Sequence, residues 1–424
     1  MKDIFGEDYY FRKEIFNRAE DLAGYYGFLP ISLPHIEKEE LFTKTLGETS
    51  DVVEKQMFVV KSGGDRLVLR PEATAGIMRA YFEHGMHTLP QPIMLYTLGS
   101  FFRHERPQKG RFREFNQFNL EILGEEDSIA DALIIRTISL ILSEMGLQSF
   151  IVHINSLGDK ECAPLYRKEL ISFLRKKVNY LCRDCKRRLK INPLRILDCK
   201  EEKCVQLKQD APQMFNYLCE ECKKHLESLL EYLETLNIPY LLDNFLVRGF
   251  DYYSRTVFEI FENGNDQKFI ENPAIALAAG GRYDYLGDIL GGKHVPGVGV
   301  ATGIERLLLT LKERNIKFKQ EKPPKLFLIQ LGDLAKRKSL LLMENLRKAN
   351  ISLRHSLSKD NIRSQLKSAS ALKIKIVLII GQKEALEEKV IIRDMETGSQ
   401  EILQFTKAIE YLKNNGLARK FGTE

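Results

Sequence analysis

With 424 residues, the chain exceeds the about 250–300 residues that one hydrophobic core serves, so two or three domains are expected. Charged residues make up 29% and hydrophobic residues 44% of the chain, and no run approaches the ~18 apolar residues of a membrane span. We therefore expect a globular protein without a membrane segment. The 64 Lys and Arg only slightly exceed the 58 Asp and Glu, a balance that permits nucleic-acid binding without demanding it.

The beginning of the chain predicts a helix, a short strand and a loop. The first residues, MKDIFGEDYYFRKE, are acidic from position 3 and contain no apolar stretch, so we expect no signal peptide and a cytoplasmic location. Residues 28–36 read as a strand interrupted by Pro30 and Pro34, and the polar segment 47–50 as a loop beside a pocket. Residues 7–27 are predicted to form an amphipathic helix, whose apolar face carries Phe11, Ile15, Phe16, Ala19, Leu22 and Ala23.

The segment 67–80 predicts a strand followed by a helix. The strand ends just before Pro71, and Glu72, Ala73 and Thr74 open the helix. An acidic residue and a threonine at a helix start usually cap its free amides. Taken alone, this feature therefore indicates no particular function.

A charged hairpin is the centre of the sequence. Residues 93–102 read as an apolar strand, residues 107–110 as a turn, and the chain then returns as a second strand. This hairpin would gather cations and carboxylates on one sheet face, which suits a polyanionic ligand that also carries donors. The charge pattern by itself favours the alternative, an edge hairpin exposed to water. The polar residues concerned are Arg103, Glu105, Arg111, Arg113, Gln117 and Glu121.

Residues 160–238 are predicted to form an inserted helical domain. A helix at 127–146 and a strand at 151–155 precede it, and strand patterning resumes only at 240–246. The insertion is rich in Lys and holds all seven cysteines. Two Cys-x-x-Cys pairs fit either structural zinc or free thiols in a reducing cytoplasm, and the sequence leaves both open. We assign no metal ligand among the paired cysteines, which are Cys182, Cys185, Cys219 and Cys222.

Three Gly-containing motifs follow the insertion. In LVRGFDYYSRTVF at 246–258, an Arg followed by Asp-Tyr-Tyr on a strand fits a half-buried aromatic pair with a salt bridge. In AAGGRYDYL at 278–286, the Gly-Gly pair predicts a turn that allows close backbone approach. GVGVATGIERLLL at 297–309 predicts a strand that feeds a helix carrying Arg306. Its glycine spacing is one residue too long for the dinucleotide-binding fingerprint.

The last part of the chain predicts a separate α/β domain. A charged stretch with two adjacent prolines suggests a linker at 317–324. Residues 1–316 before it carry all the motifs described above. In 325–424, strands and helices alternate, which indicates an α/β module with a mostly parallel sheet.

The order of these motifs resembles that of the class II aminoacyl-tRNA synthetases, in particular their histidyl branch. The hairpin carries Phe102-Arg103-x-Glu105 and then Arg111-x-x-x-Phe115, which is similar to motif 2 of the class. The resemblance implies an α+β fold with an antiparallel class II catalytic sheet, the helical insertion and a C-terminal α/β anticodon-binding domain. Relatives usually carry Pro-Arg-Gly-Thr before an Asp-Ile pair, and here that tetrapeptide is absent before positions 3 and 4. The stretches similar to motif 1, motif 3 and the two histidyl-type motifs are 7–36, 297–309, 246–258 and 278–286.

The resemblance assigns ATP to the hairpin and to motif 3. Arg103 would hold the α-phosphate, Glu105 the adenine amino group, and Phe115 would stack on the base. Arg113 and Arg306 complete the implied ATP-binding set, and Mg²⁺ is expected to accompany the nucleotide. A guanidinium suits phosphate charge and an aromatic plane suits adenine, so the residue types agree with these roles. The catalytic residues implied are Arg103, Arg248 and Arg306.

The resemblance also implies a binding site for the amino acid histidine. Glu121 and Tyr253 would take the ring nitrogens, and a neutral imidazole, with one donor and one acceptor, suits a carboxylate and a phenol. Gln117, Glu72 and Thr74 would take the α-ammonium group. The full set implied is Glu72, Ala73, Thr74, Arg103, Gln117, Glu121, Arg248, Tyr252 and Tyr253.

The expected activity is the activation of L-histidine with ATP, followed by transfer to tRNA(His). A homodimer is expected from the family, and activation is expected not to depend on zinc. The alternative is a non-catalytic paralogue, such as the regulatory subunit of ATP phosphoribosyltransferase. Such paralogues typically lack the LVRG-type motif and the anticodon domain, and both are intact here.

Overall fold

The computed structural model describes residues 3–47, 50–106, 110–262, 276–317, 325–357 and 360–417. The chain divides into two compact units, Met1–Phe318 and Lys319–Glu424. Residues 107–109 of the turn predicted at 107–110, the middle of the loop predicted at 47–50 and the linker prolines lie outside the described residues. Among the described helices, none is both long and apolar enough to cross a membrane.

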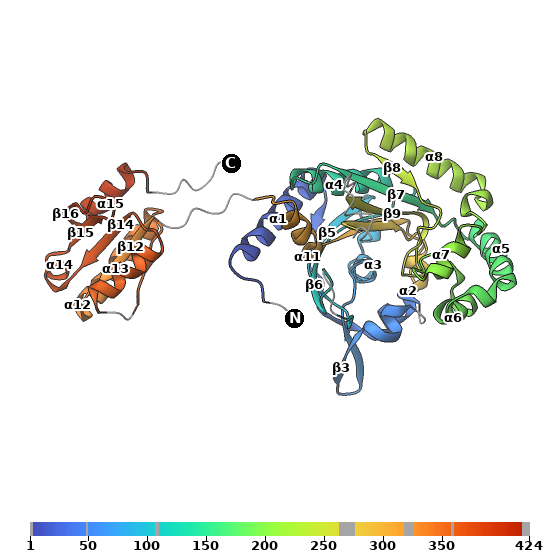
Figure 1. Cartoon of the computed structure of the whole chain (residues 1–424), viewed down its shortest axis with the longest axis horizontal. Coiled ribbons are helices and arrows are strands. Elements are labelled where there is room, and N and C mark those ends of the chain that lie inside the picture. The colour runs from blue at the N-terminus through green and yellow to red at the C-terminus, as the bar shows by residue number, and fades with distance from the viewer. Residues whose placement is uncertain are drawn as a thin grey trace. The chain divides into compact units, whose positions relative to one another are not determined.

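The first unit is built on one eight-stranded sheet (Figure 1). All inner pairings are antiparallel, and only the two outermost pairings are parallel. The α+β class with an antiparallel catalytic sheet is thereby confirmed. In spatial order the strands are β1 (Leu29–Pro30), β5 (Ile93–Phe102), β6 (Glu114–Leu123), β11 (Gly297–Gly303), β10 (Ala278–Arg282), β9 (Ser254–Glu262), β7 (Phe150–Ser156) and β8 (Tyr240–Leu242).

Helices cover one face of this sheet. The alternate residues Phe118, Leu120 and Ile122 of β6 are buried in a core shared with these helices. Because side chains alternate along a strand, the residues between them face the opposite side. The covering helices are α1 (Glu7–Tyr25), α4 (Ile129–Glu144) and α11 (Ile304–Glu313).

A smaller sheet and three helices pack on the other side. The expected strand at 28–36 is instead two short strands in different sheets, because Pro30 and Pro34 lack the amides needed for continuous pairing. Helix α3 contributes Ile77 and Met78 to a second core. The elements are β2 (Ile36–Lys38), β4 (Asp65–Leu69) and β3 (Phe58–Ser62), with helices α2 (Glu39–Leu46), α3 (Thr74–Glu83) and α10 (Leu286–Ile289).

The segment between β7 and β8 is helical (Figure 1). Strand β8 is shorter than the strand expected at 240–246. The Gly-Gly pair expected to turn lies inside strand β10, where the pairing register with β9 shifts between Gly281 and Arg282. The helices are α5 (Cys162–Lys176), α6 (Arg183–Ile191), α7 (Glu202–Lys208) and α8 (Glu220–Thr235).

The second unit is a five-stranded sheet with helices on both faces. Helix α13 covers one face, and α12, α14 and α15 cover the other. Two of its four pairings are parallel and two antiparallel, so the sheet is mixed rather than mostly parallel. The strands, in spatial order, are β13 (Arg354–His355), β12 (Leu326–Gln330), β14 (Ile376–Ile380), β15 (Lys389–Asp394) and β16 (Gln400–Gln404); the helices are α12 (Asp333–Lys348), α13 (Ile362–Ala371), α14 (Gln382–Glu387) and α15 (Phe405–Asn414).

Candidate active site

A cavity of about 390 Å³ opens on the face of the large sheet opposite α1 and α4. Strand β6 lines it with alternate residues, and the residues of β11 paired with them are Gly299, Ala301 and Gly303. Because β11 contributes almost no side-chain volume, the floor of the cavity is backbone. The β6 residues on the wall are Phe115, Gln117, Asn119 and Glu121.

The carboxylate of Glu121 lies directly over Gly299. A Cβ atom at position 299 would be 1.6 Å from Glu121 Oε2, so only glycine leaves room for this carboxylate. Thr74 Oγ1 donates to Oε1 at 2.8 Å, and the Tyr283 hydroxyl donates to Oε2. Burial raises the pKa of Glu121 to about 8, although both hydrogen bonds oppose that rise.

Glu72 also carries a buried carboxylate on the cavity wall. Its Oε2 accepts from the Thr74 amide at 2.7 Å and its Oε1 from the Ala75 amide at 2.9 Å, which caps the start of α3. Burial raises the pKa of Glu72, against the lowering by these two amides and by Arg103. The expected cap is present, and the same residue borders the cavity.

Arg103 is held between the start of α3 and two aromatic rings. Its Nε donates to the Pro71 carbonyl at 2.9 Å. The guanidinium carbon lies 5.3 Å from the ring centroid of Phe115 and 5.6 Å from that of Phe250, within the range of cation–π attraction. Burial lowers the pKa of Arg103. These contacts fix a buried cation at the cavity wall.

Arg306, on α11, brings a second cation to the same wall. Burial lowers its pKa first, and the positive charges of Arg111 and Arg103 lower it further. Arg111 is 3.6 Å from Glu105 in an ion pair, so one carboxylate offsets part of this charge. Crowded cations of this kind favour an anionic ligand, which would relieve their mutual repulsion.

The loop before β9 supplies a third arginine and two tyrosines. Arg248 donates from Nη1 to Glu259 and lies 5.3 Å from the ring centroid of Tyr253. The Tyr252 and Tyr253 rings are 4.6 Å apart. The strand expected for this motif begins only at Ser254, so these three residues lie in an irregular segment that bends into the cavity.

The structure brings together every predicted histidine-site residue and every predicted ATP-site residue except Arg113. Arg113 is exposed on a bend before β6. Its backbone carbonyl accepts a hydrogen bond from the Arg103 amide at 2.9 Å. Its role in ATP binding stays a prediction. The residues found on the wall are Glu72, Ala73, Thr74, Arg103, Glu105, Phe115, Gln117, Glu121, Arg248, Tyr252, Tyr253 and Arg306.

Several wall residues were missed from the sequence. Tyr283 belongs to the 278–286 motif, which was noticed but given no role. Asn119 alternates with Gln117 and Glu121 on the return strand, so the period of two would have found it. The Asn119 amide nitrogen is buried and has no acceptor within the described part of the chain, as expected of a group that meets a ligand. Phe250 could be recognised as a wall residue only from the structure, because the folding of the loop before β9 brings it to the cavity.

Comparisons with known proteins agree with this geometry. A family model described as histidyl-tRNA synthetase matches residues 1–307, and one described as an anticodon-binding domain matches residues 325–415. The histidine–tRNA ligase of Desulforamulus reducens is 39% identical to this chain, and the match covers 92% of this chain and 91% of that ligase. That of Thermodesulfovibrio yellowstonii is 39% identical over 100% of this chain and 98% of its own.

A solved structure gives the same result. The apo histidyl-tRNA synthetase of S. aureus superposes with a TM-score of 0.78 and 34% identity, over 97% of this chain and 98% of that one. The matches cover both units and the whole cavity. The chain therefore belongs to the histidyl-tRNA synthetase family.

Proposed function

We propose that this chain activates L-histidine with ATP in the cavity and transfers the histidyl group to tRNA(His). The observation that carries the proposal is the meeting of Arg103, Arg248 and Arg306 with the buried Glu121 in one cavity. Three cations suit the phosphates of ATP, and a carboxylate behind them suits a ligand with N–H donors. Relatives that match nearly the full chain are histidine–tRNA ligases, which supports the proposal.

In this proposal the reaction is promoted by charge and position. The histidine carboxylate, the nucleophile, is already ionised at neutral pH, so the α-phosphate can be attacked without a general base. What the site must supply is alignment and neutralisation of the charge that builds up at phosphorus. Arg103 and Arg306 would hold the triphosphate, and Arg248 would bridge the histidine carboxylate and the α-phosphate. Phe115, beside Arg103, would stack on adenine, and Glu105 would accept from its amino group.

Selection of histidine would come from the far end of the cavity. Glu121 accepts two hydrogen bonds from protein groups, and a carboxylate has lone pairs left for a ring N–H. Tyr253 would take the other ring nitrogen, and Glu72, Thr74 and Gln117 the ammonium group. Because such polar groups stay unpaired with an apolar amino acid, the site would reject apolar competitors strongly.

Mg²⁺ is also part of the proposal. Apart from Glu105, which is assigned to adenine, the cavity wall carries carboxylates on Glu259 and Glu305, and hard oxygen ligands of this kind fit the ion. Triphosphate oxygens would supply most of its coordination, with one of these carboxylates completing it. The ion would neutralise phosphate charge together with the arginines.

We further propose a cytoplasmic homodimer that holds tRNA with its C-terminal unit. Large apolar side chains are exposed on α1, β1 and β2, the region similar to motif 1, which forms the dimer interface in this class. The seven free thiols suit a reducing compartment. Light scattering at several concentrations would test the dimer. The exposed side chains concerned are Tyr9, Tyr10, Tyr25, Leu29 and Ile36.

The test of activation is ATP–pyrophosphate exchange with each of the twenty amino acids. We expect exchange with histidine alone. A non-catalytic paralogue would give no exchange with any amino acid, and a ligase for another amino acid would respond to that one. The readout therefore separates the proposal from its alternatives.

The test of transfer uses the C-terminal unit. Arg337 and Arg363 are exposed on α12 and α13, and we assign them to contacts with the RNA backbone. Reversing both charges, Arg337→Glu with Arg363→Glu, should slow charging of tRNA(His) and leave histidine-dependent exchange unchanged. Equal rates of charging in both proteins would exclude these two residues from tRNA binding.

A further inference from the structure

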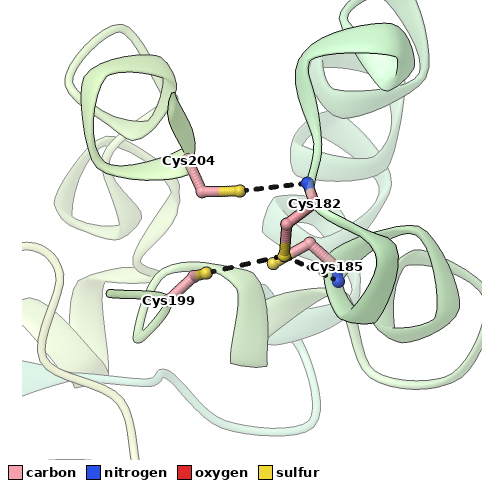
Figure 2. A group of neighbouring side chains, drawn as sticks. All are labelled: Cys182, Cys185, Cys199 and Cys204. Carbon is pink, nitrogen blue, oxygen red and sulfur yellow. Dashed lines mark hydrogen bonds between the residues drawn. The ribbon is translucent and has the colours of Figure 1, made fainter. Parts of the chain in front are cut away.

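Four cysteines meet inside the helical segment between β7 and β8 (Figure 2). Cys182 and Cys185 stand at the start of α6, Cys204 is on α7, and Cys199 lies between these helices. Figure 2 shows the four side chains pointing toward one another from these separate elements. In the sequence, only Cys182 and Cys185 of this group form a Cys-x-x-Cys pair. The fold brings Cys199 and Cys204 next to them.

The spacing of the sulfurs fits tetrahedral coordination. All four Sγ atoms lie within 4.8 Å of one another, and Cys182 Sγ and Cys199 Sγ are 3.9 Å apart. Four thiolates about 2.3 Å from a tetrahedral Zn²⁺ lie roughly 3.8 Å apart, which is close to this separation. A disulfide would need about 2.05 Å between two of them.

Backbone amides already point at two of these sulfurs. The Cys185 amide donates to Cys182 Sγ at 3.4 Å, and the Cys182 amide donates to Cys204 Sγ at 3.3 Å. Cys182 thereby caps α6, so the positive end of that helix faces the cluster. Both features stabilise thiolates, which are the form that binds metal.

The surroundings also offset negative charge. A zinc ion with four thiolates carries a net charge of −2, which is costly to bury without nearby cations. In 183–208, nine Lys and Arg stand against four Asp and Glu. The four cysteines are all buried, so no coordination position is left open to solvent.

We propose that Cys182, Cys185, Cys199 and Cys204 bind one structural Zn²⁺. A closed set of four cysteines is typical of structural rather than catalytic zinc. The elements involved are short: α6 has 9 residues and α7 has 7. Isolated helices shorter than about 12–15 residues are marginal in water, so a metal that joins them would fix their arrangement.

The zinc-held segment also reaches the cavity. Asn192, just after α6, donates to Asp251 at 2.7 Å, and Arg195 donates to the Gly249 carbonyl at 3.2 Å. Both acceptors flank Phe250 in the loop that carries Arg248. The metal would therefore help to hold this loop, a consequence that rests on the proposed function.

A second cluster provides a matched control. Asp159, Cys162, Cys219 and Cys222 also lie within 4.8 Å of one another. Here, however, Asp159 Oδ1 already accepts from the amides of Glu161 and Cys162 at 2.9 and 3.1 Å, and Cys219 is partly exposed. One member is thus a carboxylate in use as a helix cap, and the set is not closed.

The test is the zinc content of the full chain, purified without chelator and measured by plasma mass spectrometry. Cys182→Ser with Cys185→Ser should lose one equivalent of zinc per chain relative to the unmodified protein. Cys219→Ser with Cys222→Ser should not lose that equivalent. Unchanged zinc in the first variant, or loss in the second alone, would overturn the proposal. Metal content does not depend on catalysis, so this result stays separate from the exchange assay.

Two measurements on the unmodified protein guard against misfolding of the variants. Loaded with Co²⁺, it should show the d–d and charge-transfer bands of tetrahedral thiolate coordination. Denatured in the presence of a chelator, it should expose seven reactive thiols; five would mean a disulfide and would contradict the proposal. Chelation of the native protein should make 183–208 sensitive to a protease that cuts after Lys and Arg.

Discussion

Two buried arginines from neighbouring motifs have opposite surroundings. Arg282 is fully buried, and its Nε donates to Asp131 at 2.7 Å and its Nη1 to Asp284 at 3.0 Å. Nη1 also donates to the carbonyl of Glu125 at 3.0 Å, and Nη2 donates to the carbonyl of Asp127 at 2.8 Å. Protein acceptors thus take four of the five N–H groups of this guanidinium.

Arg248 lies instead in an incomplete network. It pairs with Glu259, and its buried Nε finds no acceptor among the residues that the structure describes. In the same cavity Glu121 has a raised pKa and Arg306 a lowered one, both because of burial first. A buried charge whose partners are all protein groups stabilises the fold, and one whose partners are missing is prepared for a ligand.

The sharpest test of this difference is Arg282→Met. Removing the guanidinium leaves Asp131 and Asp284 buried without their partner, so the free energy of unfolding should fall by about 3–5 kcal/mol. Urea denaturation followed by circular dichroism measures this change. Arg66→Met, which removes an exposed arginine paired with Glu39, should leave the midpoint nearly unchanged. Similar midpoints for the two variants would show that the Arg282 network is not structural.

Arg248→Ala should show the reverse pattern. Exchange of pyrophosphate should slow by about 10²–10³-fold, the effect of removing one preorganised transition-state donor, while histidine binding is largely kept. The urea midpoint should move little, because the Glu259 carboxylate left behind is partly exposed to water, unlike Asp131 and Asp284. Arg248→Lys keeps the charge but not the fork of donors and should give an intermediate rate. Near-normal exchange in the alanine variant would remove Arg248 from the mechanism.

This contrast was only partly predictable from the sequence. The apolar pattern and the turn residues predicted the two strands β5 and β6. The two-residue period of a strand predicted that Gln117 and Glu121 lie on the same face. The motifs AAGGRYDYL and LVRGFDYYSRTVF both contain an Arg followed by tyrosines, so their residues alone do not tell a structural arginine from a functional one. The difference comes from Asp131, on α4, which is distant in sequence from Arg282.

Local sequence also failed where tertiary pairing decided the outcome. The 246–253 segment has strand-forming residues but stays irregular, because side chains of the segment turn into the cavity. Arg195 also holds the Gly249 carbonyl, and Asn192 holds the Asp251 carboxylate. Cys199 and Cys204 belong to no Cys-x-x-Cys pair, so only the fold shows that they join Cys182.

Glu121→Gln should affect one substrate only. Replacing the carboxylate by an amide removes charge from its hydrogen bond to the histidine ring, a loss of about 1.5–3 kcal/mol in histidine binding. ATP affinity should stay almost unchanged, because the arginines on the wall are intact. Calorimetry with each ligand measures both, and equal losses would mean that Glu121 only supports the fold.

The last prediction concerns pH and the same carboxylate in the absence of ligand. Burial raises the pKa of Glu121 to about 8 in the folded protein, from 4.5 for an ordinary glutamate. Between these values the folded protein keeps a proton that the unfolded chain releases, so stability falls as pH rises. The full slope for one such group is about 1.4 kcal/mol per pH unit.

Comparison with Glu121→Gln isolates this slope, because the other titrating groups are common to both proteins. Between pH 5.5 and 7.5, the free energy of unfolding of the unmodified protein should decrease relative to that of the variant. Well above pH 8, where Glu121 is ionised in both the folded and the unfolded state, the difference should become constant. Urea titrations at several pH values measure it. A difference independent of pH throughout would mean that Glu121 is already ionised in the empty cavity, stabilised by its bonds to Thr74 and Tyr283, and thus as fully paired as Arg282.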